Sequence, residues 1–180
     1  SAENLNKTNM ETDRIILRPW RESDAEILFK WASNPDVGPR AGWPPHKSVE
    51  ESLEIIRTVF SAPETYAIVL REEMIPIGAI AIKSGEGLSP SLRGTGDAEL
   101  GYWLAEEYWG RGLMTEAARA IIERAFGTLG YRLLWCGYYE GNERSRRVME
   151  KCGFKPHHTE HNKPTLLGDT RTEHFMRSER

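Results

Sequence analysis

Residues 108–117 read Tyr-Trp-Gly-Arg-Gly-Leu-Met-Thr-Glu-Ala, and they decide the fold because they join a glycine turn to the start of a helix. Gly110 and Gly112 let the backbone curl, and small or apolar residues then recur at helical spacing as far as residue 125. Residues 99–104, just upstream, have the composition of a strand. A strand, a glycine turn and a helix N-terminus present converging amides and a favourable dipole. We therefore expect a pyrophosphate site made largely of backbone here.

Two common nucleotide-binding motifs do not account for this turn. No Gly-Lys-Ser/Thr follows it, so a P-loop would lack its lysine and its magnesium-binding hydroxyl. A dinucleotide-binding fold needs a third glycine where Thr115 stands, and an acidic residue in the next predicted strand, Leu133–Tyr139, which has none. The two glycines are also compatible with a tight connection that binds nothing.

The rest of the chain predicts strands and helices in a mixed order. Ser23 with Glu26, and Ser48 with Glu51, have the spacing of a helix capping box. The order of elements and the lack of an internal repeat predict an α/β (mixed α+β) single domain with a central sheet. Strands are expected at residues 14–18, 66–70, 75–82, 98–104, 133–139 and from 154. Helices are expected to begin after residues 23, 48, 112 and 142. Loops are expected at residues 37–47 and 84–96, and the second is expected to be long and mobile.

The two ends of the chain differ in character. Residues 1–11 are mostly polar, so we expect them to form a flexible N-terminal tail. Residues 12–180 are long enough to bury a core and are expected to form one domain. We assign no function to the tail.

Composition and charge exclude several classes of protein. The 180 residues contain 24 Lys and Arg against 27 Asp and Glu, a net charge of −3, so we expect no nucleic-acid partner. No apolar run approaches the roughly 20 residues of a membrane-spanning helix, and no signal-peptide pattern is visible. We therefore expect no membrane contact and a cytoplasmic location. Cys136 and Cys152 are too few and too isolated for a disulfide framework or a zinc site.

Histidines near the C-terminus raise the question of a metal. His157, His158 and His161 lie with Glu160 in one short segment. Adjacent side chains of a strand point to opposite faces, which separates the two neighbouring histidines. We therefore predict no metal centre.

The wider sequence around the glycine turn resembles the acetyl-CoA signature of the GNAT acyltransferase superfamily, on residues 99–104 and 108–117. Residues 142–145 and 148–154 resemble its late motif, and residues 12–19 resemble the first strand of its RimJ/RimL-type branch. The resemblance spans residues 12–159. One departure is Glu107, where the family usually opens the turn with Gln or Arg. The implied fold is a central mixed, mostly antiparallel twisted sheet flanked by helices.

The resemblance also implies a coenzyme site for acetyl-CoA, which acts as a co-substrate. The strand that ends at Leu104 would splay from Leu133–Tyr139 and leave a wedge for the pantetheine arm, which pairs with main-chain groups as an added strand would. Asn142 and Ser145 would face the wedge, although they also suit a helix cap and an exposed helix position. The expected coenzyme-binding residues are Trp103, Leu104, Gly110, Arg111, Gly112, Leu113, Met114, Thr115, Asn142 and Ser145. Arg144, Arg146, Arg147 and Lys151 suit either the 3′-phosphate or a solvated helix face.

Acetyl transfer to an amine requires a neutral nucleophile, so a base must take its proton. Glu99, on the central strand, is the candidate base, and a charged residue at a solvated strand end is its alternative reading. A main-chain amide near Leu104 would stabilise the negative oxygen that develops. The thiolate needs a proton donor, and the tyrosine that many family members use corresponds to Met149, which cannot donate. The resemblance makes Ser145 the substitute, with Tyr138 and Tyr139 as further options.

These features together predict an N-acetyltransferase that moves the acetyl group from acetyl-CoA to a primary amine. The branch resemblance favours the N-terminal α-amine of a protein such as a ribosomal protein. A small-molecule amine, for example a polyamine or an antibiotic, is the alternative acceptor, and a non-catalytic acyl-CoA sensor is an alternative of another class. The loops around Trp43 and at residues 84–96 are expected to shape the acceptor cleft. A homodimer is left open.

Overall fold

The computed structural model describes residues 9–180 and contains one eight-stranded sheet in the order β1-β2-β3-β4-β5-β6-β8-β7. Every neighbouring pair is antiparallel except β5 and β6, which are parallel. The mixed, mostly antiparallel sheet predicted from the sequence is confirmed. Its strands are β1 Met10–Glu11, β2 Ile15–Arg18, β3 Thr65–Leu70, β4 Ile75–Lys83, β5 Ala98–Leu104, β6 Leu133–Tyr139, β7 Lys155–Pro164 and β8 Thr170–Glu179, and its helices are α1 Ala25–Ala32, α2 Gly38–Ala41, α3 Val49–Thr58, α4 Leu113–Gly127 and α5 Glu143–Lys151.

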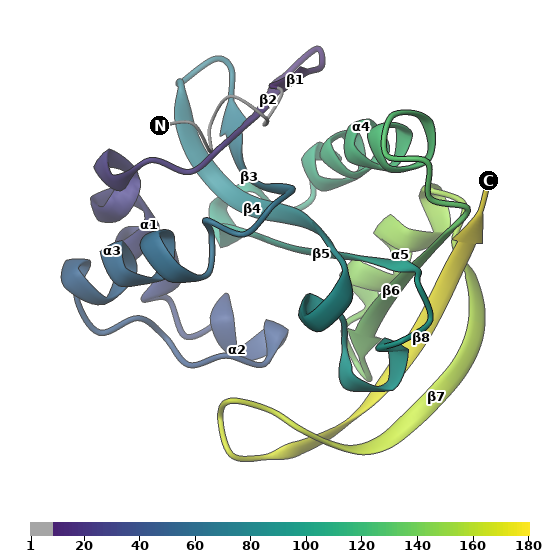
Figure 1. Cartoon of the computed structure of the whole chain (residues 1–180). Helices are drawn as coiled ribbons and strands as arrows, with labels where there is room; N and C mark the ends of the chain where they lie inside the picture. The colour runs from purple at the N-terminus through teal and green to yellow at the C-terminus, as the bar shows by residue number, and fades with distance from the viewer. Residues whose placement is uncertain (1–8) are drawn as a thin grey trace.

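Helices cover both faces of the sheet (Figure 1). On one face α1 and α3 bury Leu28 and Ile56 against small residues of β3 and β4. On the other face α4 places Ala117, Ala118 and Ile121, all fully buried, against β2, β4 and β5. Fully burying an isoleucine side chain contributes about 1.5–3 kcal/mol, so this stripe fixes α4, and with it the glycine turn that precedes it, on the sheet.

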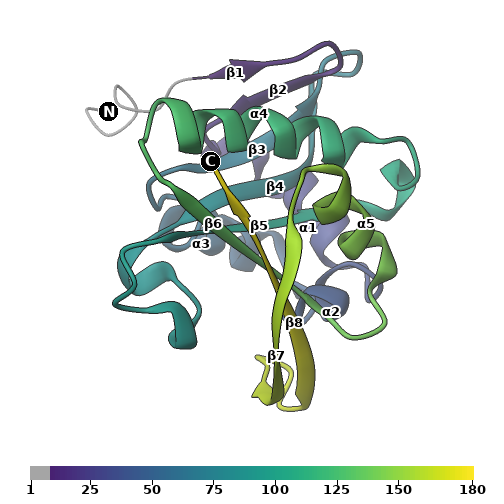
Figure 2. The ribbon, with the colours of Figure 1, turned by 90° about the vertical axis from the view of Figure 1, so that its right-hand side faces the viewer.

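The sheet is partly split in its middle. β5 and β6 pair only at Ala98–Leu100 with Leu134–Cys136, although the strands continue to Leu104 and Tyr139. Beyond these three pairs they separate, and Figure 2 shows β6 and β8 running at a steep angle to β3, β4 and β5. The split leaves one edge of β5 without a neighbouring strand, as the resemblance implied.

The paired part of the chain begins before the predicted domain boundary at residue 12. Met10 pairs with Leu17, and Glu11 pairs with Ile16. The rest of the predicted tail, residues 1–8, lies outside the described residues.

Two local predictions need correction. Ser23 does not cap α1, because a 3-10 turn at Glu22–Asp24 comes first and the Asp24 carboxylate accepts hydrogen bonds from the Arg21 amide and the Arg18 guanidinium. The predicted loop at residues 37–47 contains the short helix α2, which begins at Gly38 with Pro39 in its first turn. Helix α3 begins as predicted, since the Ser48 Oγ accepts the Glu51 amide at 3.0 Å.

Candidate active site

A cavity of about 330 Å³ lies at the split, between β5, the glycine turn, α4, α5 and α2. All of the predicted coenzyme-binding residues except Arg111 line it, and these are Trp103, Leu104, Gly110, Gly112, Leu113, Met114, Thr115, Asn142 and Ser145. The Arg111 side chain instead turns back over the Tyr108 ring and donates to the Glu107 carbonyl. The Arg111 side chain therefore does not contact the cavity, and only the backbone of Arg111 could bind a ligand at the turn.

The glycine turn owes its shape to left-handed backbone. Gly110 and Gly112 both have φ of +76°, and Gly112 is the N-cap of α4. Open space surrounds the position of a Cβ on Gly110, so conformation rather than crowding requires glycine there. The amides of the first turn of α4 have no acceptor within the helix. They lie at the cavity, at the positive end of the helix dipole. This arrangement fits a pyrophosphate.

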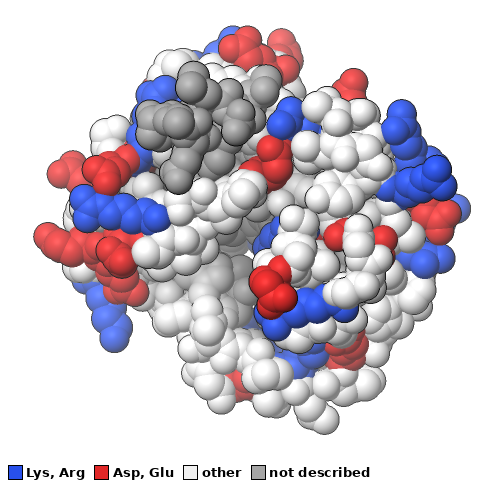
Figure 3. Space-filling model, in the orientation of Figure 1, with Lys and Arg blue, Asp and Glu red and all other residues white. Residues whose placement is uncertain are grey.

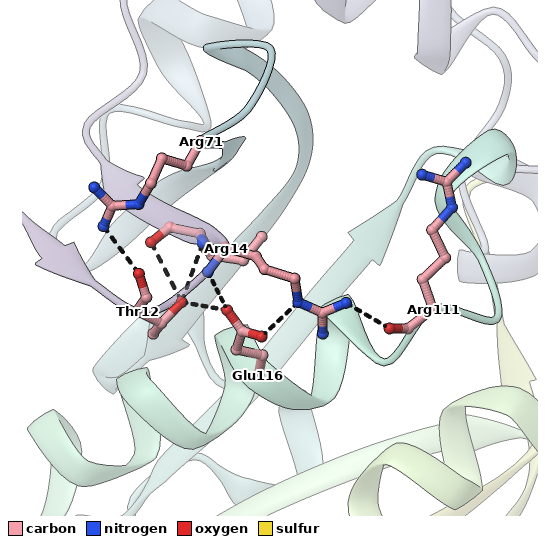
Figure 4. Close-up of polar contacts among 6 residues, drawn as sticks. Thr12, Arg14, Arg71, Arg111 and Glu116 are labelled. Carbon is pink, nitrogen blue, oxygen red and sulfur yellow. Dashed lines mark hydrogen bonds and ion pairs between the residues drawn. The ribbon is translucent and has the colours of Figure 1, made fainter.

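An ion-pair cluster fixes the other side of the turn (Figure 4). The Glu116 carboxylate accepts hydrogen bonds from the Thr12 hydroxyl at 2.5 Å, from the Arg14 amide at 2.8 Å and from the Arg14 Nε at 2.9 Å. The Arg14 Nη1 then donates to the Arg111 carbonyl at 2.9 Å. Burial opposes ionisation of Glu116, but its hydrogen bonds from Thr12 and Arg14 outweigh burial and lower the pKa. The connection between β1 and β2 thus holds the carbonyl of Arg111 in the turn.

The free edge of β5 offers backbone groups to a ligand. The Ala105 amide donates to the Ile77 carbonyl of β4 at 2.8 Å. Because alternate residues of a strand point their polar backbone groups the same way, the amides of Tyr102 and Leu104 point away from β4, into the split. The Leu104 carbonyl accepts the indole Nε1–H of Trp109 at 2.8 Å. The unpaired strand edge suits an extended pantetheine arm.

Three arginines gather at the mouth of the cavity. Arg40, Arg144 and Arg147 line it together, and the Arg144 guanidinium lies 3.7 Å from the centre of the Trp109 ring. Partial burial, followed by the positive charges of Arg40 and Arg147, lowers the pKa of Arg144. Like charges held this close favour an anionic ligand such as a phosphate. Arg146 pairs instead with glutamates of its own helix.

Two hydroxyl groups meet at the inner end of the cavity. The Tyr102 Oη lies 2.9 Å from the Ser145 Oγ and 3.1 Å from the Ser145 carbonyl oxygen, to which it donates. Burial raises the pKa of Tyr102 well above its ordinary value, so the phenol keeps its proton. Asn142 caps α5, since its side-chain oxygen accepts the Ser145 amide at 3.3 Å. Met149 is only 1% exposed, packs in the core and does not line the cavity, whereas Ser145 and Tyr102 both do.

Glu99 is held by a loop. It is 4% exposed and accepts two hydrogen bonds from Ser89, one from the amide and one from the hydroxyl, both at 2.7 Å. Leu88 and Leu92 of the same loop are buried. Glu99 therefore anchors the loop at residues 84–96, which packs on the sheet through two 3-10 turns. These hydrogen bonds, rather than the position of Glu99, argue against its role as the base.

Sequence reasoning missed several residues that line the cavity, and Tyr102 and Arg40 are the two with polar side chains that the site uses. Tyr102 belongs to the quoted signature, and strand alternation puts it on the same face as the buried Leu100 and Leu104, a signal that was available. Arg40 reaches the site from α2, a segment that no local pattern connects with residues 110 and 144.

The C-terminal histidines form ordinary polar contacts. His158 and Lys163 hold Glu160 at 2.8 and 2.7 Å, and Ser91 donates to it at 2.7 Å. Among residues 9–180, no three His, Cys, Asp or Glu side chains are grouped to hold a metal ion. No helix within that range is long and apolar enough to cross a membrane. Basic and acidic side chains are interspersed on the face shown in Figure 3.

The chain matches known proteins over most of its length. The model of the acetyltransferase (GNAT) domain matches residues 14–155. The uncharacterized N-acetyltransferase YoaA of Bacillus subtilis (strain 168) is 29% identical over 151 residues, which are 81% of this chain and 82% of YoaA.

Two solved structures share the fold. RimL, a ribosomal L7/L12 α-N-protein acetyltransferase in complex with coenzyme A, has a TM-score of 0.79 at 18% identity, over 96% of this chain and 98% of RimL. The microcin C7 self-immunity acetyltransferase MccE, in complex with acetyl-CoA and AMP, has a TM-score of 0.76 at 17% identity, over 94% of each chain. Taken with the domain match and the geometry of the split sheet, these findings show that the chain belongs to the GNAT family of acetyl-CoA-dependent acetyltransferases.

Proposed function

We propose that this acetyltransferase modifies the N-terminal α-amine of a protein. The observation that carries the proposal is the split of the sheet, which borders different side chains on its two faces. The coenzyme cavity lies on the face of α4 and α5, and aromatic side chains border the opposite face, where an acceptor would enter. Trp43 and Trp103 meet there edge to face, with ring centres 5.7 Å apart. The resemblance to the RimJ/RimL-type branch supports a peptide acceptor.

The acceptor side is walled by two segments that are distant in sequence. The β7–β8 hairpin contacts the α2 segment through the Leu166 amide, which donates to the Gly42 carbonyl at 3.1 Å, and through Arg171, which donates to the Pro39 carbonyl at 2.6 Å. These contacts close the cleft along one side and leave an elongated wall of ten-residue strands. An extended chain terminus suits such a wall better than a compact molecule does.

The reaction needs no covalent enzyme intermediate. The amine nitrogen attacks the thioester carbonyl carbon, a C–N bond forms, the C–S bond breaks, and one proton passes from nitrogen to the sulfur. The amide of Leu104 faces the carbonyl oxygen as its charge develops, and the Ser145–Tyr102 pair supplies a proton to the thiolate.

A small-molecule amine is the second candidate acceptor. MccE, which shares the fold, was solved with AMP bound as well as acetyl-CoA. Acceptor loops vary among proteins that keep one coenzyme site, so the fold leaves room for either class of acceptor.

The proposal is tested by mass spectrometry of acceptor pools incubated with the enzyme and acetyl-CoA. One pool holds ribosomal-protein N-terminal peptides, a matched pool holds the same peptides with blocked N-termini and free lysines, and a third holds polyamines and aminoglycosides. We expect acetylation in the first pool alone. Acetylation confined to the third pool would assign the protein to small-molecule modification, and binding without any thiol release would assign it a sensor role.

A further inference from the structure

Glu173 is a carboxylate at the split that the coenzyme site does not use. It lies on β8, paired with Tyr139 of β6, on the face of the sheet opposite α4 and α5. Strand alternation places Glu173, Gly137 and Tyr139 on the same side, and the parallel ladder places Glu99 and Gly101 there as well. Glu173 therefore faces the side from which an acceptor would approach.

Two glycines face each other where β5 and β6 separate, and each lies under a charged side chain. A Cβ on Gly137 would lie 2.7 Å from the Glu173 Oε2, so the carboxylate rests directly over the β6 backbone. A Cβ on Gly101 would lie 2.9 Å from the Lys83 Nζ. The missing side chains thus let a carboxylate and an ammonium reach the opening of the split.

Among the described residues, none donates a hydrogen bond to the Glu173 carboxylate and none forms an ion pair with it at contact distance. Glu99, its acidic neighbour, differs in that Ser89 donates to both of its oxygens. Two carboxyl groups in one region, one satisfied and one free, have different roles available to them. The satisfied group holds a loop, and the free group can accept a proton.

We infer that Glu173 is the general base that takes the proton from the acceptor amine. This inference rests on the proposed acetylation of an amine and names a residue for one step of it. An ammonium ion binds over Gly137 beside Glu173, and the carboxylate accepts one proton, directly or through one water. The neutral nitrogen then attacks the thioester, and its second proton leaves for the thiolate by way of Tyr102 and Ser145. Glu173 returns its proton to solvent.

The charges around Glu173 suit this role. Burial, and next the negative charge of Glu99, raise the pKa of Glu173 to about 7. Glu160 adds to the rise, and Lys163 and Lys83 act against it. A base is most effective when its pKa lies near the working pH.

The test compares Glu173→Gln with Glu99→Gln, and with Glu123→Gln, which removes an exposed charge on α4, as the matched control. The rate of thiol release is measured from pH 5.5 to 9 with an N-terminal peptide and, separately, with a small amine. We expect kcat/KM of the wild type to rise with pH through a limb near 7, and Glu173→Gln to lower it about 100-fold at pH 8 and to abolish the limb. Coenzyme A affinity, measured by calorimetry, stays within twofold and reports on folding.

Two more variants keep the test decisive. Glu173→Asp is expected to recover part of the rate, and Gly137→Ala, whose methyl would displace the carboxylate, to lower kcat/KM at least tenfold. If Glu173→Gln keeps the limb and a rate within threefold of wild type, or if only Glu99→Gln removes the limb, the inference is wrong. If the small amine is acetylated and the peptide is not, the proposed acceptor is wrong. The role of Glu173 is still tested in that case, because the pH dependence of the rate can be measured with the small amine.

Discussion

At the scale of single residues, the shared hydrogen bond between Tyr102 and Ser145 sets the proton supply. The two hydroxyl oxygens are 2.9 Å apart, and burial keeps the phenol neutral. In the proposed reaction the pair acts as one donor to the departing thiolate. Residues that act as a unit give effects that are not additive.

Ser145→Ala and Tyr102→Phe are therefore each expected to lower kcat about 10- to 100-fold, and the double variant to lower it little further. Steady-state thiol release checks this, with Tyr131→Phe as the matched control. Two independent losses that multiply in the double variant would show that the hydroxyls act separately.

Single residues of the coenzyme site were easier to predict than those of the chemistry. Most of the predicted coenzyme-binding residues lie in one short stretch with two glycines and a helix start, so local sequence was enough to place them in the cavity. Glu99 was chosen as the base because it lies on the central strand, but Ser89, ten residues earlier, satisfies it. Glu173 reaches the split from β8 only through sheet pairing, which no local pattern encodes.

At the scale of elements, the connection between β1 and β2 supports the N-terminus of α4. The Arg14 side chain spans from the Glu116 carboxylate to the Arg111 carbonyl, so a segment at the start of the chain orients a turn in its middle. The amides of the turn depend on this support for their direction.

Arg14→Ala is expected to raise the dissociation constant of coenzyme A about tenfold, or about 1.4 kcal/mol, and to leave kcat at saturating coenzyme within twofold. Calorimetry with coenzyme A measures this, and Arg93→Ala, in the loop before β5, is the control. An unchanged affinity would show that the turn keeps its shape without this support.

Helix α2 and the residues after it border both sides of the split. Its Arg40 faces the coenzyme cavity, with the guanidinium 5.4 Å from the centre of the Trp109 ring, and Trp43 just beyond it contacts Trp103 on the acceptor side. Arg40→Ala is expected to weaken coenzyme A binding about threefold to tenfold without changing KM for the acceptor. Trp43→Ala is expected to raise KM for the acceptor without changing the affinity for coenzyme A. Binding and kinetic measurements on both variants check this, and an equal effect of both on both constants would contradict it.

Helices and strands with strong periodicity were predictable, and their exceptions have physical causes. The predicted cap of α3 is present because the Ser48 hydroxyl makes its hydrogen bond with the first turn of the helix. The box predicted at Ser23 failed because a 3-10 turn at Glu22–Asp24 precedes α1, and the Asp24 carboxylate, paired with Arg18, accepts the Arg21 amide at the start of that turn. Helix α2 was missed because four residues around a proline carry no helical period.

At the scale of the whole molecule, the order of elements predicted the fold class, and the resemblance supplied the split. Strands β1–β5 form one part of the sheet and β6, β8 and β7 the other. Only three residue pairs join them across the sheet, and the chain crosses between them through α4. Composition alone contains nothing about this division.

Coenzyme A is expected to slow amide hydrogen exchange in β6 and β8 more than in β3 and β4. A ligand that binds only the closed form stabilises it by about 2.7 kcal/mol at one hundred times its dissociation constant. Exchange followed by mass spectrometry, with and without coenzyme A, tests this. Equal slowing in both parts of the sheet would show that they open as one unit.

The three-pair junction has a consequence for the lifetime of the protein. Opening there exposes strand edges and core side chains to proteases, and cleavage follows the population of the open form. If the coenzyme binds in the proposed cavity, it contacts β5 in one part of the sheet and α5, which follows β6 in the other part. Its supply is then expected to set how often the junction opens. In a starved cell this enzyme is expected to be degraded sooner, and its abundance would then follow the metabolite it consumes.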